Sequence, residues 1–320
     1  MPKSPSQRIR MSSSKIDVKG TGAVLLAVLI TSTIILFLKY FTVYIDAWTA
    51  NGLRYSMVVL IYLPWLLFAR RRGFFNRRTV KLALVPAGFN LLHQVFWAFT
   101  PYFVDAGIIG FLVRISTLWA IIGSFIFFSD ERLLLRSFYF WAGVIFNIAG
   151  FTGIVIGGNH TLSGTTTIGI LLILICSILW AGYNISVRHF FRETDPKTAF
   201  GTVASLTYPG LFLLMFSVGN PSRVWAAPSY ILPLILISGI LGLAIKHVLI
   251  YTAIKRLGVS ITATVGLSSS FITALLANLL FAESLTRFQW AGGAVLVLGS
   301  GILIWAQKDF VRNDPSENKG

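Results

Sequence analysis

Cysteine and acidic residues are the two things that this sequence nearly lacks. Cys176 is the one cysteine among 320 residues, so an intramolecular disulfide and a cysteine-based zinc cluster are excluded. Aspartate and glutamate together number 11, against 27 lysines and arginines. The acids are scattered over predicted tails, loops and helix ends, so paired carboxylates for acid–base catalysis have few candidates.

The sequence also lacks the motifs of nucleotide and metal chemistry. It has no phosphate-binding loop, no Walker-type sequence, no cluster with metal-ligand spacing and no nucleophile–base pair. We therefore expect that the protein is not an enzyme, has no cofactor or metal, and does not itself drive transport with ATP. Charged residues make up 12% of the chain and hydrophobic residues 55%, too little charge for the surface of a soluble protein.

Apolar runs of about twenty residues recur along the chain, the length that crosses a bilayer as a helix. They predict an all-α membrane protein, embedded in the lipid bilayer, with ten transmembrane helices. The predicted helices are 21–40, 47–69, 82–103, 106–128, 137–157, 166–187, 197–218, 230–253, 259–281 and 287–306.

The net charge of +16 could suggest a nucleic-acid partner, but its distribution indicates membrane topology instead. If the N-terminus lies inside, the inner segments hold 21 of the 27 lysines and arginines. The predicted outer connections hold only Lys39, Arg223 and Arg287. This positive-inside bias predicts cytoplasmic N and C termini and a multi-pass protein of the cell (plasma) membrane, with no nucleic-acid partner.

The chain repeats itself at an offset of 149 residues. The pattern D-x-x-T-A-x-G starts at Asp46 and again at Asp195, and Trp-Ala-Gly starts at Trp141 and again at Trp290. Five predicted helices in each copy, an odd number, place the second copy upside down in the membrane. Inverted repeats of this kind are typical of secondary transporters, because two near-equivalent packings allow alternating access.

The repeat gives a division of the chain into domains. We predict a cytoplasmic tail (1–19), a first five-helix repeat (20–157), an outer linker (158–165), a second five-helix repeat (166–306) and a cytoplasmic tail (307–320). Glycines in the last helix of each repeat are expected to let these two helices pack tightly. They are Gly143, Gly150, Gly153, Gly292, Gly299 and Gly301.

Two matching helix ends carry a family resemblance. In each repeat an apolar helix ends in an acidic residue and a leucine, and the Trp-Ala-Gly helix follows. The two segments are Ile126-Phe127-Phe128-Ser129-Asp130-Glu131-Arg132-Leu133 and Leu279-Leu280-Phe281-Ala282-Glu283-Ser284-Leu285. Over residues 20–306 this resembles the EamA-type transporters of the drug/metabolite transporter superfamily. The resemblance implies a transporter fold and leaves the substrate open, because the family moves amino acids, nucleotide derivatives, sugars, amines and other metabolites. We expect Glu131 and Glu283 to cap the helix that follows each of them.

Three basic residues fall inside predicted helices: Arg54, Arg114 and Lys246. A charge at the centre of a membrane helix is costly and normally faces a cavity or a partner. All three are candidate ligands for an anionic substrate group. The alternative is that they extend along the helix to carbonyl groups, or to Asp46 or Asp105.

Polar residues of the predicted helix 82–103 share one face. Asn90, His93, Gln94 and Trp97 are spaced by three, four and seven residues, so they line a binding pocket or hydrogen-bond to neighbouring helices. His93 either carries a coupling proton or is simply hydrogen-bonded.

Further candidates for the substrate cavity lie elsewhere. Ser268, with Ser269 and Ser270, either packs helices closely or lines a polar path. Aromatic residues are the candidate walls of the cavity: Tyr183, Trp119 and Trp180.

These patterns together predict an alternating-access transporter of a small polar metabolite. The substrate is expected to be an amino acid or a related compound with a carboxylate or phosphate, and the expected direction is export. Exchange, facilitated diffusion or potential-driven movement is favoured over proton coupling, because no acid lies near the membrane centre. The alternatives are a membrane-embedded enzyme or lipid-handling protein, a non-transporting sensor, and a transporter of a neutral or cationic drug-like solute. The oligomeric state stays open, with a monomer as one possibility.

Overall fold

The computed structural model describes residues 17–73, 75–127, 137–157, 164–191, 194–257 and 265–312, and every regular element in these ranges is a helix. The elements are α1 (Val18–Phe41), α2 (Ala47–Arg71), α3 (Arg77–Phe103), α4 (Ala106–Leu112), η1 (Val113–Ile115), α5 (Ser116–Phe127), α6 (Phe138–Ile156), α7 (Gly164–Phe190), α8 (Pro196–Ser217), α9 (Arg223–Ala226), α10 (Ile231–Gly239), η3 (Ile240–Ile245), α11 (Lys246–Leu257), α13 (Ser269–Phe281) and α14 (Arg287–Arg312). Seven of the described helices are long and apolar enough to cross a membrane, which confirms the all-α membrane class. Glu131 lies outside the described residues.

Five predicted helices need correction. The helix expected at 259–281 has a turn at Leu267 and Ser268, directly before α13, and the helix expected at 287–306 continues to Arg312. The helix expected at 82–103 begins at Arg77, because the side chain of Asn76 accepts a hydrogen bond from the Thr79 amide (3.0 Å) and caps an earlier start. The helix expected at 106–128 contains one 3₁₀ turn, η1, and the helix expected at 230–253 contains a π-helix, η3. Sequence periodicity could not reveal these interruptions, since the residues on both sides are equally apolar.

The repeated D-x-x-T-A-x-G motif is a helix start. Asp46 accepts hydrogen bonds from the amide and the hydroxyl of Thr49, both at 2.8 Å, at the beginning of α2. Asp195 does the same with the amide (3.1 Å) and hydroxyl (3.3 Å) of Thr198 at the beginning of α8. The two copies of the motif therefore perform the same local task, which is to satisfy free amides of the first helical turn.

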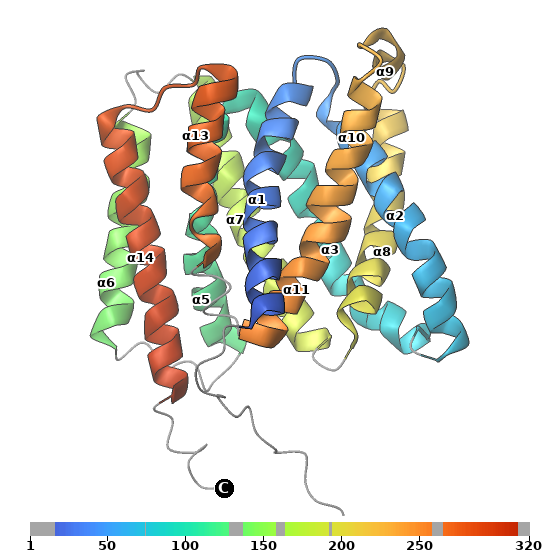
Figure 1. Ribbon diagram of the computed structural model, residues 1–320, viewed down its shortest axis with the longest axis horizontal. Helices are drawn as coiled ribbons and strands as arrows, with labels where there is room; N and C mark the ends of the chain where they lie inside the picture. The colour runs from blue at the N-terminus through green and yellow to red at the C-terminus, as the bar shows by residue number, and fades with distance from the viewer. Residues whose placement is uncertain are drawn as a thin grey trace, which may run out of the picture.

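Helices α6 and α14 lie side by side at one end of the molecule, at the left in Figure 1. A Cβ on Gly150 would lie 2.3 Å from the backbone nitrogen of Leu296, and one on Gly299 would lie 2.7 Å from that of Asn147. The side chains of Asn147 and Ser300, both fully buried, hydrogen-bond across the contact at 3.0 Å. The predicted tight packing of these two glycine-bearing helices is confirmed.

Helices α2 and α8 pack together at the opposite end, and α1 stands between the two groups, in contact with α11 and α13 (Figure 1). Gly52 and Gly201 lie at the crossing of α2 and α8, where Met215 of α8 covers Gly52 and Tyr62 of α2 covers Gly201. This arrangement leaves a central space that α1, α2, α3, α5, α7, α11 and α13 surround.

Candidate functional site

A cavity of about 320 Å³ occupies the centre of the bundle. This volume is in the range that small-molecule sites use. Six of the nine predicted site residues line it: Arg54, His93, Gln94, Trp97, Arg114 and Lys246. The sequence had placed them on four separate helices, and the tertiary fold brings them to one cavity.

The two interrupted helices supply two of the three cations. Arg114 is the middle residue of the 3₁₀ turn η1, and Lys246 is the first residue after the π-helix η3. Local departures from α-helical hydrogen bonding turn side chains out of their regular positions and are common at functional sites. Here they direct a guanidinium and an ammonium group toward the same space.

Arg114 is held by hydroxyl groups of α13. Its Nε donates to Ser270 Oγ at 2.8 Å, and its Nη2 donates to Ser269 Oγ. Both serines are buried. Because the two hydroxyl groups are neutral, they hold the guanidinium of Arg114 in place without neutralising its charge.

Arg54 is more deeply enclosed, with 1% of its surface exposed. Its Nε and Nη1 atoms have no hydrogen-bond partner among the described residues, and no ion pair there links it to an acid. The predicted alternative in which it extends to Asp46 or Asp105 is therefore not what the structure shows.

Aromatic and imidazole rings form one wall of the cavity. His93 stacks on Trp97 with ring centroids 5.9 Å apart and contacts Trp180 at 5.1 Å. The Nζ atom of Lys246 lies 6.0 Å from the ring centroid of Trp180, where a cation is attracted to the aromatic face.

His247 also lines the cavity, and the sequence had given no reason to select it. Its Nδ1 lies 2.8 Å from the carbonyl oxygen of Leu243, so that nitrogen is the donor and carries the proton. Its ring stacks on Phe200 at 4.3 Å. The one available signal was its position next to Lys246 in an apolar helix.

Three predicted site residues lie away from the cavity. Asn90 donates to Tyr55 (2.8 Å) and Thr207 (3.0 Å), which is the interhelical alternative. Tyr183 is buried in the cluster that contains Phe191. Ser268 is exposed and donates to the carbonyl oxygen of Val265 at 2.7 Å, whereas Ser269 next to it reaches the cavity.

The electrostatic character of the cavity is positive. None of the described residues that line it is an aspartate or glutamate. Lys246, Arg54 and Arg114 all line this cavity. Since like charges repel most strongly in a medium of low dielectric constant, this arrangement favours a bound anion.

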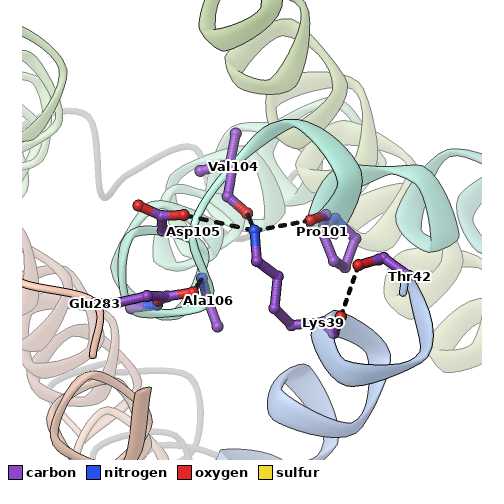
Figure 2. Close-up of polar contacts among 8 residues, drawn as sticks. Lys39, Thr42, Pro101, Val104, Asp105, Ala106 and Glu283 are labelled. Atoms are coloured by element: carbon purple, nitrogen blue, oxygen red, sulfur yellow. Dashed lines mark hydrogen bonds and ion pairs between the residues drawn. The ribbon is translucent and has the colours of Figure 1, made fainter. Parts of the chain in front are cut away.

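Beyond one end of this cavity, contacts converge on the corner between α3 and α4 (Figure 2). The Nζ atom of Lys39 donates to the carbonyl oxygens of Pro101 (3.1 Å) and Val104 (3.3 Å), and it pairs with Asp105 at 3.5 Å. The end of α3 is thereby tied to the last turn of α1 through one side chain.

Glu283 completes these contacts from the other side. Its carboxylate accepts from the backbone amides of Ala106 (3.1 Å) and Gly107 (3.0 Å), the first turn of α4. Burial raises the pKa of Glu283 above its ordinary value, although the two amides oppose this shift. The prediction that Glu283 caps the following helix was wrong. Thr286 and Gln289 cap α14 reciprocally, so Glu283 is free to cap α4.

Residues 167–305 match the EamA-like transporter family. The predicted resemblance is confirmed over these residues. The protein is therefore a multi-pass membrane protein whose second half is EamA-like. The chain is also similar to a protein of Methanothermobacter thermautotrophicus that is named an uncharacterized transporter. The two are 23% identical over 199 residues, which are 62% of this chain and 56% of that relative, little more than half of its length.

The fold has a counterpart among solved structures. A crystal structure superposes on 91% of this chain and 98% of its own, with a TM-score of 0.62 and 16% sequence identity. At that identity the likeness concerns the fold alone.

Proposed function

We propose that this protein is an alternating-access transporter of the cell membrane that exports a small polar metabolite with a carboxylate or phosphate group. One observation carries the proposal. Arg54, Arg114 and Lys246 line a central cavity in which the described lining residues include no acid. An anionic group supplies the missing countercharge, and an amino acid or related metabolite fits the volume of about 320 Å³.

The transport mechanism that we propose needs ten membrane spans in two inverted repeats. The helix interruptions support it. If Glu131 and Glu283 occupy equivalent positions in the two repeats, Arg114 of the first repeat corresponds to Gly266 of the second. The predicted helix 106–128 is interrupted at η1, around Arg114. The predicted helix 259–281 has a turn at Leu267 and Ser268, beside Gly266. Discontinuous helices in corresponding positions of two repeats are typical of secondary-transporter binding sites.

Export is the direction that the position of the cavity favours. Of α1, the cavity touches Val24 through Ile35, while the contacts of Lys39 and Glu283 lie beyond it. If the N-terminus is cytoplasmic, as the charge bias predicts, those contacts close the outer end and the cavity loads from the cytoplasm. An inside-negative potential then favours the exit of an anion by ~2.3 kcal/mol per charge per 100 mV.

Transport by purified protein in liposomes tests the proposal. A panel of radiolabelled amino acids, organic acids and phosphate esters is expected to contain a substrate. Arg114→Ala and Lys246→Ala are each expected to reduce its uptake at least tenfold, because each removes a cation from the cavity. Arg223→Ala is the matched control, since Arg223 is exposed and lies outside the cavity.

Two outcomes contradict the proposal. Movement of neutral or cationic solutes but no anion favours the drug-like alternative, for which the Trp97 and Trp180 wall is the supporting feature. If no solute is transported while the protein stays folded, the result favours the enzyme or sensor alternatives.

A further inference from the structure

Among the described residues, three side chains at the cavity hold buried polar atoms without a hydrogen-bond partner: Arg54, Gln94 and His93. Arg54 and Gln94 differ most in hydrogen-bonding character. Arg54 has its Nε and Nη1 donors without partners, and Gln94 has its Oε1 acceptor without one, among the described residues. Their exposed fractions are 1% and 4%, and both residues line the cavity. Buried polar groups in folded proteins are nearly always hydrogen-bonded, and an exception in a cavity points to a ligand.

The two residues belong to one corner of the cavity. The Nδ2 atom of Asn51 donates to the backbone oxygen of Gln94 at 2.6 Å, which joins α2 to α3 at this level. Arg54 follows Asn51 by three residues, so it lies one helical turn further along the same face of α2. This corner therefore presents a permanent cation and an amide oxygen from adjacent helices.

Their hydrogen-bonding characters are opposite. The guanidinium of Arg54 can only donate, and Oε1 of Gln94 can only accept. An unsubstituted carboxylate, or a phosphate ester in its fully ionised form, satisfies Arg54, but it brings no proton to Gln94 and leaves that oxygen unpaired beside a negative charge. A ligand that satisfies both residues carries an anionic group and, close to it, an N–H or O–H donor.

We propose that Gln94 is a specificity-determining residue that recognises an amino or hydroxyl group beside the anionic group of the substrate. The substrate class is then amino acids and hydroxy acids, in preference to unsubstituted acids of the same skeleton. This inference rests on the proposed function, since it takes an anion in the cavity as given.

Binding to the purified full-length protein, measured by calorimetry, tests the inference with three matched sets of acids. The sets are alanine, lactate and propionate; phenylalanine, phenyllactate and phenylpropionate; and glutamate, 2-hydroxyglutarate and glutarate. In at least one set the amino or hydroxy acid is expected to bind about tenfold more tightly or better than the unsubstituted acid, because the latter leaves a buried acceptor unpaired.

Gln94→Met removes the acceptor at similar size. It is expected to lower the affinity of the preferred acid about tenfold and to leave that of the unsubstituted acid unchanged. Gln94→Asn keeps an amide and is expected to retain part of the preference. Asn278→Leu removes an exposed amide outside the cavity and is expected to leave the preference as it is.

The outcomes separate the two proposals. Equal binding of substituted and unsubstituted acids overturns the role of Gln94 while anion transport stands. The role of Gln94 is also overturned if the Gln94→Met variant unfolds at the wild-type temperature and still prefers the substituted acids. If none of the nine acids binds, this inference is overturned, and the liposome panel decides on anion transport independently.

Discussion

Arg54 and Arg114 are both arginines of a membrane helix, yet their surroundings differ. Arg114 is held by Ser269 and Ser270, two neutral hydroxyls of a helix that lies more than 150 residues further along the chain. Arg54 has two donors without partners. The sequence selected both residues because a charge inside a membrane helix is costly. It could not assign their partners, which depend on how α2 and η1 pack on other helices.

Asp46 gives a prediction at the residue scale. Burial by itself raises the pKa of Asp46, but hydrogen bonds from the amides of Thr49 and Asn220 outweigh it, so the net pKa is below its ordinary value. Asp46→Ala removes these bonds and is expected to cost about 1 kcal/mol, typical of a lost N-cap. The measurement is the thermal unfolding of purified protein.

The dependence on pH follows from the sign of the shift. A carboxylate with a lowered pKa in the folded state stabilises the fold above its unfolded value of about 3.9. This contribution is lost as the pH falls through the lower folded pKa. The difference between wild type and Asp46→Ala should therefore be largest near neutral pH and shrink below about pH 3. A difference that grows on acidification contradicts this account.

The contact between helices α6 and α14 gives a prediction at the scale of secondary-structure elements. Gly150→Ala places a Cβ 2.3 Å from the backbone nitrogen of Leu296, a distance that requires the two helices to separate. We expect a destabilisation of about 1–3 kcal/mol, the usual cost of overpacking. The measurement is thermal unfolding in detergent.

Gly88→Ala is the matched control. Gly88 also lies in a helix, but a Cβ there has nothing within 4 Å. Since alanine is the better helix former, this variant should be neutral or more stable by up to about 1 kcal/mol. If both variants unfold at the same temperature, the close approach of α6 and α14 does not limit stability.

The glycine spacing predicted this contact, because small residues at regular intervals let membrane helices approach closely. The interruptions at η1 and η3 were not predictable in the same way. Whether a turn becomes 3₁₀ or π depends on neighbouring helices, such as Ile34 of α1 packing on Gly242 within η3.

The contacts of Lys39 and Glu283 act at the scale of the whole molecule. They join α1, the α3–α4 corner and the connection between α13 and α14 at one end of the bundle. If the proposed transport mechanism is right, they close that end. Glu283→Ala leaves two amides of α4 unpaired and is expected to shift the population toward a state open at that end. Lys39→Ala should act in the same direction.

Thiol labelling measures this shift. Cys176→Ser removes the native cysteine, and Ala277→Cys then places a thiol on α13, where Ala277 is fully buried. A membrane-impermeant maleimide should react at least several-fold faster when Glu283→Ala is added. The exposed Arg287→Ala is the control, expected to leave the rate unchanged. Equal rates in all three proteins would show that Glu283 does not hold this end closed.

The sequence by itself determined the class of protein, the two matching helix starts at Asp46 and Asp195, and the tight packing of α6 on α14. These follow from local chemistry: apolar length, capping side chains and glycine spacing are properties of short segments. Only the tertiary structure decided that six candidate residues share a cavity, that Asn90 and Ser268 do not, and that Glu283 caps α4. Those results depend on contacts between segments far apart in the chain, which no local pattern encodes.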